Sequence, residues 1–404
     1  MEFKKVTKTQ ENNKPEEQGN TIFHQVEDYL ENNYDIRYNK ISLDIEISLK
    51  EHNNWKIANE NSLYIELRKK NIAVSMNNLL AVLKSDFIPN YNPLKNYFNS
   101  LPKWNNSVDY IKKYASYINL SPGENVEQFH YHFKKWCVRA VKCVLIDGYF
   151  NKQAFILTDD GKGQNIGKST WCRNLCPKSL SNYIAEDMGG SDKDSRLLLC
   201  KNFLINLDEL AALAKKEINQ LKSQLSKDQI NERLPYDRKN SVIQRVASFI
   251  GSTNKSTFLQ DETGSVRWLC FVVESIDFAY NKEFNIDNLW SQAYALSIDS
   301  AYDETISRKD ILENEIRNKK FQDLTPEHEL LLRHFRKPML KSSEEWLSST
   351  DIVDYLMTNG YTRLSLRPVN MGKALAQESF IKKKTKGSTV YSVEKKLNEY
   401  SEEK

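Results

Sequence analysis

The sequence predicts an α/β fold in which short buried strands end in polar loops. Three mostly apolar runs carry this prediction, because runs of this length and composition are typical of strands covered on both faces. They are residues 154–157, 203–207 and 246–250. A fourth run, 269–273, is assigned to the same core, and a strong helix over 129–150 is expected to pack against the sheet.

The segment after the first strand has the layout of a phosphate-binding loop. Residues 158–167 lead into Lys168-Ser169-Thr170, which opens a helix. Backbone N–H groups and a helix N-terminus favour an anion, the lysine adds a full charge, and the hydroxyl can bind Mg²⁺. Lys162 replaces the first glycine of the pattern, although glycines flank it. The predicted nucleotide-binding residues of this P-loop core are Gly163, Gln164, Asn165, Ile166, Gly167, Lys168, Ser169 and Thr170.

Two adjacent acids, Asp208 and Glu209, end the second strand. A metal-assisted nucleoside triphosphatase needs such a pair. Asp208 would hold Mg²⁺ through its water shell, and Glu209 would orient and deprotonate the attacking water. Taken alone, the acids could equally form a solvated turn. Their position behind a phosphate loop favours the catalytic interpretation.

Two more polar residues complete the predicted site. Asn254 ends the third strand and could contact the γ-phosphate or the attacking water. Arg267 lies on the turn before the fourth strand and is a candidate arginine finger, a role worth roughly 10³–10⁵ in rate when supplied in trans. A surface arginine beside a strand is the alternative. The predicted catalytic residues are Lys168, Glu209, Asn254 and Arg267, and the predicted metal ligands are Ser169 and Asp208.

In combination and order, these motifs resemble the virulence-associated E family, P-loop ATPases of phages, plasmids and genomic islands that are related to AAA+ and superfamily 3 proteins. The resemblance covers roughly residues 91–273 and rests on GQNIGKST, FLINLDE, LPYDR, SFIGSTN and DETGSVRW. The chain departs from the family at Lys162 and at Val266, where many members carry the first of two arginines. The resemblance implies ATP and Mg²⁺ as cofactors, unwinding or remodelling of DNA during replication of a mobile element, and a ring, expected to be hexameric.

A basic stretch lies between the second and third strands. Residues 211–227 are predicted to form an amphipathic helix with lysines outward, and residues 233–239 and Arg245 add further positive charge. In related helicases this insertion holds a hairpin that lines a central pore. Basic side chains beside an aromatic ring suit phosphate and base contacts, whereas a solvated, salt-bridged surface is the alternative. The candidate DNA-binding residues here are Lys222, Arg233 and Arg238.

The chain changes character after Asn318. Helices are predicted over 351–357 and 365–377, followed by a hairpin over 380–393. Helix, helix and hairpin at this size indicate a winged helix, with the second helix as the recognition element and the hairpin as its wing. A winged helix that binds protein is the alternative. The wing would contact DNA through Lys382, Lys383 and Lys384.

The predicted domains follow from these patterns. Residues 21–128 form a mainly helical N-terminal region, in which residues 34–49 alternate in places as a hairpin would. The predicted boundaries are 1–20 for a disordered tail, 21–128, 129–318 for the P-loop ATPase core and 319–398 for the winged helix.

The composition limits the kinds of partner that the chain is expected to bind. The 404 residues carry a net charge of only +4, so DNA contacts must come from local basic patches. The six cysteines show no paired metal-ligand or disulfide spacing, which fits a reducing cytoplasm. The chain shows neither a long apolar span nor a leader, so no membrane partner is expected. No primase motif precedes the core, so a separate primase would supply any priming.

Two other functions fit parts of the sequence. The first is a P-loop regulator that binds DNA through the C-terminal domain without unwinding it. The second is a small-molecule kinase, which would need a substrate pocket and a lid instead of a basic insertion. The order of Asn254 and Arg267 favours a ring ATPase over the kinase.

Overall fold

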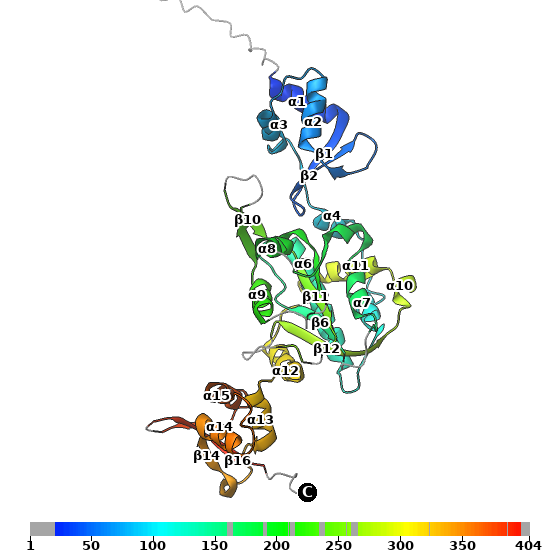
Figure 1. The fold of residues 1–404 in the computed structure, drawn as a ribbon. Helices are drawn as coiled ribbons and strands as arrows, with labels where there is room; N and C mark the ends of the chain where they lie inside the picture. Colours follow the sequence, from blue (N-terminus) through cyan, green and yellow to red (C-terminus); the bar gives the residue numbers. More distant parts are fainter. Residues whose placement is uncertain are drawn as a thin grey trace, which may run out of the picture. The chain divides into compact units, whose positions relative to one another are not determined.

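Figure 1 shows the chain as a mixed α/β protein in a computed structural model. The described residues are 21–159, 165–188, 192–208, 210, 215–233, 239–255, 257–259, 266–322, 324–385 and 387–396. The predicted tail, residues 1–20, lies outside them. The chain divides into two compact units, Met1–Ser100 and Leu101–Lys404, and each is described by itself.

The N-terminal unit combines helices with a small sheet. Its elements are α1 (Ile22–Asn33), β1 (Tyr34–Asn39), β2 (Asp44–Leu49), β3 (Lys56–Ile57), α2 (Glu60–Lys69), α3 (Met76–Leu83), β4 (Asn90–Tyr91) and α4 (Pro93–Ser100). The predicted hairpin is confirmed, since β1 and β2 pair antiparallel. The sheet has the order β3-β2-β1-β4, so it extends the hairpin on both sides. The apolar face of the hairpin packs with α1, α2 and α3 around Val26, Leu67 and Leu79.

A six-stranded sheet forms the centre of the second unit. The strands are β5 (Ile118–Leu120), β6 (Ala154–Thr158), β7 (Ile184–Glu186), β8 (Leu204–Leu207), β11 (Ser248–Thr253) and β12 (Trp268–Ile276). Their order is β5-β12-β6-β11-β8-β7, and all pairings are parallel except that of β5 with β12. The four predicted strands are therefore confirmed as β6, β8, β11 and β12. Because they run parallel, their carboxyl ends meet at one edge of the sheet.

Helices and turns connect and cover these strands. They are α5 (Tyr110–Ala115), α6 (Val126–Leu145), α7 (Lys168–Asn174), η1 (Lys178–Tyr183), α8 (Asp192–Lys201), α10 (Tyr280–Glu283), α11 (Ile286–Ile298), α12 (Arg308–Asn318) and η3 (Lys319–Phe321). Helix α6 packs on the sheet as predicted. Its buried Trp136 donates from Nε1 to the carbonyls of Gln153 and Phe249, at 3.2 and 3.1 Å, and so bridges two strands.

The basic stretch forms helix α9 (Lys215–Leu225) and a hairpin of β9 (Gln229–Glu232) and β10 (Ser241–Gln244). One expectation for this stretch is wrong. Arg245 is not a surface residue but is fully buried. Its guanidinium donates to the carbonyls of Gln224, Leu225 and Lys227 at the C-terminal end of α9, at 3.0 to 3.2 Å.

The C-terminal elements follow the predicted order. They are α13 (Pro326–His334), β13 (Phe335–Arg336), η4 (Lys341–Ser343), β14 (Glu345–Ser348), α14 (Ser349–Thr358), α15 (Pro368–Gln377), β15 (Lys382–Lys384) and β16 (Thr389–Lys395). Both helices and the β15–β16 hairpin are confirmed. Leu331, Ile352 and Leu375 join α13, α14 and α15 in one apolar core. The segment predicted to begin this domain instead contacts the central sheet's own core, because Phe321 packs against Phe258.

None of the helices in the described part of the chain is both long and apolar enough to cross a membrane.

Candidate active site

The predicted phosphate loop lies at the carboxyl end of β6 and leads into α7. Gly167 caps the helix with a left-handed backbone, φ 90° and ψ 15°, and Asn165 also has a positive φ of 63°. Glycine also leaves room for Phe278, because a Cβ at 167 would force the ring of Phe278 to shift. Residues 160–164, which include Lys162, Gly163 and Gln164, lie outside the described residues.

Three oxygens from different segments meet beside the loop. Ser169 Oγ donates to Asp208 Oδ1 at 2.6 Å, and Ser252 Oγ donates to the same oxygen at 3.0 Å. The two hydroxyl oxygens lie 2.9 Å apart. The structure therefore brings the two predicted metal ligands together. Sequence reasoning missed Ser252, although strand alternation places it on the same side of β11 as Asn254.

Lys168 is held by a carboxylate that the sequence analysis also missed. Its Nζ forms an ion pair with Asp159 Oδ2, and the two side chains are only 4% and 2% exposed. A buried ammonium group needs such compensation, since an unpaired charge in this environment is costly. Asp159 directly follows β6, just as Asp208 directly follows β8. That shared position after a buried strand is the signal that could have found it.

Lys168 and the three oxygen-bearing side chains of Ser169, Asp208 and Ser252 line one pocket of about 380 Å³. The loop supplies residues 165–170, the turn after β8 supplies Asp208, and the end of β11 supplies Ser252, Thr253 and the exposed Asn254. Phe278, which sequence reasoning did not select, completes the lining. Glu209, the predicted base, lies outside the described residues. The described predicted residues that this pocket brings together are Asn165, Ile166, Gly167, Lys168, Ser169, Thr170, Asp208 and Asn254.

Arg267 lies at the opposite edge of the sheet, where the parallel strands begin. Its carbonyl accepts a hydrogen bond of 2.8 Å from the backbone N–H of Ala154, the first residue of β6, whereas the loop follows the last. The five residues of β6 span roughly 13 Å. The side chain turns toward the residue that follows α9, where its Nε donates to Ser226 Oγ at 3.0 Å. The structure thus does not bring Arg267 into the pocket of its own chain.

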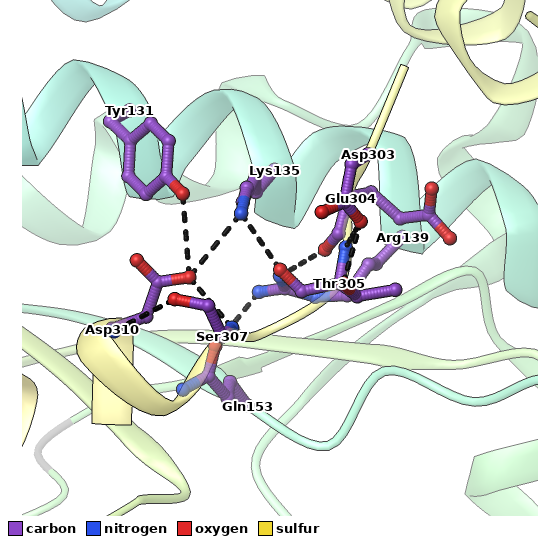
Figure 2. A network of polar contacts seen from close by, with 9 residues as sticks. All are labelled: Tyr131, Lys135, Arg139, Gln153, Asp303, Glu304, Thr305, Ser307 and Asp310. Carbon is purple, nitrogen blue, oxygen red and sulfur yellow. Dashed lines mark hydrogen bonds and ion pairs between the residues drawn. The ribbon is translucent and has the colours of Figure 1, made fainter. Parts of the chain in front are cut away.

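A buried polar network reinforces this opposite edge (Figure 2). From α6, Lys135 donates to the carbonyl of Thr305 at 2.7 Å and contacts Asp310 at 3.3 Å. Arg139 donates to the Gln153 side chain at 2.9 Å and to the carbonyl of Glu304 at 3.1 Å. The network therefore fixes the segment before α12 to α6 and to the start of β6.

Two features of the network bear on charge and on Arg267. Burial alone would raise the pKa of Asp310, but hydrogen bonds from Ser307 and the Lys135 ammonium hold it below its ordinary value. Gln153 Nε2 donates to the carbonyl of Val266 at 2.7 Å. Because Val266 directly precedes Arg267, the network also fixes the backbone that carries the predicted finger.

The candidate DNA-binding residues fall in two places. Lys222 is half-buried on α9, and Arg233 is exposed just after β9, while Arg238 lies outside the described residues. Lys382, Lys383 and Lys384 form β15 and are all exposed. The ammonium group of Lys383 lies 3.7 Å from the centroid of the Trp346 ring, so an aromatic side chain accompanies this basic strand.

The chain was compared with solved structures and with curated proteins. Two solved structures align with most of the chain at low identity. They are the apo C-terminal region of NrS-1, residues 305–718 in its own numbering (12% identity, 89% of this chain and 87% of that one, TM-score 0.44), and SCCmec type IV Cch, described as an active helicase (11%, 86% and 68%, TM-score 0.29). No curated protein shows a significant match to the sequence.

The family comparison concerns the central part of the chain. Residues 99–322 match the virulence-associated protein E-like domain. This range contains the central sheet, the pocket and the insertion with α9. Since it spans more than half of the 404 residues, the chain belongs to the virulence-associated protein E-like domain family.

Proposed function

We propose that this chain is a P-loop ATPase that unwinds or remodels DNA during replication of a mobile genetic element. The observation that carries the proposal is the pocket in which the left-handed turn before Lys168 faces the cluster of Ser169, Ser252 and Asp208. A turn of this kind ahead of a helix suits an anion, and the oxygen cluster suits a cation. Together they match a nucleoside triphosphate with its metal.

In this proposal the loop amides and Lys168 hold the β- and γ-phosphates. The ion pair between Lys168 and Asp159 has a defined consequence. An incoming phosphate competes with Asp159 for the ammonium group, so nucleotide binding exchanges one anionic partner of the lysine for another. The lysine thereby stays charge-compensated both before and after binding.

The residues present fit Mg²⁺. Ser169 and Asp208 would hold it, because hydroxyl and carboxylate oxygens are its preferred protein ligands and here lie within 2.6 Å of one another. When bound, Mg²⁺ supplies charge neutralisation to the phosphates. Glu209 is proposed to take the proton of the attacking water, and Asn254, which is exposed at the pocket, to contact the γ-phosphate.

Arg267 is proposed to act from a neighbouring copy of the chain. In its own chain it lies at the start of β6, across the sheet from the pocket. A ring of identical subunits can place the starting edge of one sheet against the pocket of the next. This arrangement would make hydrolysis depend on assembly, and a homo-oligomeric ring is therefore part of the proposal.

DNA contacts are proposed for the insertion and for a C-terminal winged helix. The insertion contributes α9 and the hairpin of β9 and β10, with Lys222, Arg233 and Arg238. The C-terminal domain contributes β15, whose three lysines are exposed, beside the helices α14 and α15. Lysine side chains along an exposed strand favour contacts with phosphates, which supply affinity without sequence readout.

The decisive experiment measures ATP turnover with and without single-stranded DNA. Wild type is compared with Glu209→Gln and Lys168→Ala, and the exposed Lys178→Ala serves as the matched lysine control. Glu209→Gln should bind ATP but lose turnover, whereas Lys168→Ala should lose binding. Unchanged turnover in Glu209→Gln would overturn the assignment of the base, and unchanged binding in Lys168→Ala would overturn the site.

A regulator that binds DNA without unwinding it is the second candidate, favoured by the exposed lysine strand outside the pocket-bearing sheet. Strand displacement on a forked duplex distinguishes the two functions. The motor should separate the strands with ATP. The regulator should show only DNA-stimulated turnover.

A further inference from the structure

We propose that Phe278 is the surface on which the base of the bound nucleotide stacks. This assigns the pocket to a nucleotide rather than to polyphosphate in general, and it rests on the proposed function. The residue follows β12 and lies in the same pocket as the phosphate loop, although it is distant from Gly167 in the sequence.

The ring of Phe278 contacts the backbone of the loop directly. A Cβ added to Gly167 would collide with two atoms of the ring and touch a third. At the same time Phe278 remains 49% exposed. An aromatic side chain is thus packed at the loop while about half of it stays open to a ligand, which leaves apolar surface for another flat group to cover.

Local hydrogen bonds fix the backbone turn that carries the ring. The turn that carries it is closed by Ala279 N, which donates to Asp277 Oδ1 at 2.9 Å, and by Asn281 N, which donates to the Phe278 carbonyl at 3.1 Å. The Tyr280 ring lies nearly parallel, with centroids 6.3 Å apart and an angle of 27°. The turn and the neighbouring Tyr280 ring therefore place the Phe278 side chain at the mouth of the loop.

Buried aromatic residues connect this turn to the helix of the phosphate loop. Tyr280 packs edge-on against Tyr114 with centroids 5.7 Å apart. Tyr114 in turn stacks on Trp171 of α7 at 4.8 Å and donates from its hydroxyl to the Trp171 carbonyl. The stacking surface and the phosphate-binding helix therefore belong to one rigid cluster, so their separation is set by packing.

The chemistry of the pocket divides between these two parts. Lys168, Ser169 and Asp208 supply charge and oxygen ligands, which suit phosphates and their metal. Phe278 supplies an aromatic ring, which suits the flat face of a base and accepts any base because every base has such a face. Phosphate and base are thus recognised by different residues and can be separated by experiment.

The test compares a ligand that has a base with one that lacks it. Calorimetry gives Kd for ADP and for pyrophosphate, both with Mg²⁺, in wild type, Phe278→Ala and Phe278→Trp. Phe278→Ala should weaken ADP binding by about 5- to 100-fold and leave pyrophosphate binding within about twofold. Phe278→Trp, which retains a stacking surface, should bind ADP as wild type does. Phe23→Ala, a change to an exposed phenylalanine of the N-terminal unit, is the matched control.

Three other outcomes would each overturn the stacking proposal. Equal losses for both ligands in Phe278→Ala would show that the ring only supports Gly167, and the stacking proposal would fall. Wild-type protein that binds pyrophosphate as tightly as ADP would also overturn it, while leaving the phosphate site intact. Wild-type protein that binds neither ligand would overturn the proposed function along with it.

Discussion

Ser169 and Asp208 share a hydrogen bond of 2.6 Å although they lie on different segments, one at the start of α7 and the other just after β8. Parallel strands explain this proximity. The loop after β6 and the turn after β8 emerge at the same edge of the sheet, on either side of β11, which pairs with both strands. Ser252 of β11 fills the position between them and donates to the same carboxylate oxygen.

Removal of the Ser252 hydroxyl should weaken the use of Mg²⁺. In Ser252→Ala, Asp208 loses a hydroxyl donor, so its carboxylate is less firmly oriented toward the metal. We expect the Mg²⁺ concentration for half-maximal ATP turnover to rise by about 3- to 10-fold. A magnesium titration of turnover measures this. Ser297→Ala, which removes another buried serine hydroxyl that donates to a backbone carbonyl, should not shift the titration. An unshifted titration in Ser252→Ala would contradict the assigned role.

Acid should destabilise the protein through His132. Burial, with a contribution from the Arg317 charge, lowers the pKa of this histidine to about 3. Between an ordinary value of about 6.5 and pH 3, the unfolded chain binds a proton that the folded chain does not. The free energy of unfolding therefore decreases as the pH is lowered through this window, by up to about 1.4 kcal/mol per pH unit. Urea unfolding at pH 7, 6 and 5 should show a steeper fall in wild type than in His132→Gln. Parallel curves would contradict the mechanism.

Short-range patterns in the sequence were sufficient to predict the strands that build the pocket edge. Apolar runs of strand length located β6, β8, β11 and β12, and the residues after them identified Ser169, Asp208 and Asn254. These predictions succeed because a buried strand and the loop that follows it are neighbours in the chain. The same reasoning found the β1–β2 and β15–β16 hairpins, whose partners are also close in sequence.

Residues that depend on distant partners escaped this reasoning. Phe278 joins the pocket only because β12 lies beside β6, and no pattern in the sequence around it indicates a binding residue. Arg245 was misinterpreted for the converse reason. Positive charge in a basic stretch suggested a surface contact, but its partners are backbone carbonyls that only the fold brings around it. Composition cannot distinguish a cation that binds DNA from one that ends a helix.

Substitution of Arg245 should therefore affect stability and not only DNA binding. Its guanidinium satisfies carbonyls at the end of α9, where a positive charge also favours the helix dipole. Burial lowers the pKa of this arginine to about 10, which reflects the cost of placing the charge there. Arg245→Met leaves those carbonyls without donors and should lower the free energy of unfolding by roughly 2–4 kcal/mol.

Two measurements check this expectation. Urea unfolding gives the stability, and hydrogen exchange should show faster exchange in α9 than in the central strands. Arg173→Met, which removes an exposed ion pair with Glu186, is the matched control and should cost less than about 1 kcal/mol. If the backbone amides of α9 exchange at the same rate in Arg245→Met as in wild type, the arginine does not hold the helix end.

The lysines of β15 should contribute salt-dependent affinity for DNA. Replacement of Lys382 and Lys384 by alanine removes two exposed charges from β15 while Lys383 remains beside Trp346. We expect weaker binding to duplex DNA and a decrease of about 2 in the slope of log K against log salt. Fluorescence anisotropy at several salt concentrations measures both. Alanine at Lys69 and Lys70, an exposed pair in the N-terminal unit, provides the control. A wild-type slope in the β15 variant would favour the protein-binding alternative for this domain.

The location of Arg267 leads to the most specific prediction about assembly. Since it lies beside the first residue of β6 and the pocket lies beyond the last, Arg267→Ala should retain nucleotide binding but lose turnover. Lys168→Ala should lose binding in its own pocket while still presenting an intact arginine. In a mixed ring, Arg267 of the Lys168→Ala subunit can complete the pocket of an Arg267→Ala subunit. Turnover by the mixture should therefore exceed that of either variant alone.

The control for this complementation is a mixture that cannot form a complete site. A double variant with alanine at both Lys168 and Arg267 offers neither a pocket nor a finger, so its mixture with Arg267→Ala should remain inactive. Size-exclusion chromatography with light scattering should show that all of these mixtures assemble alike. Full turnover by Arg267→Ala alone would remove the arginine from the reaction. A mixture that assembles without any gain in turnover would contradict the role of Arg267 in trans. Arg267 cannot act in its own pocket instead, because β6 and β12 run parallel and it lies at their starting end.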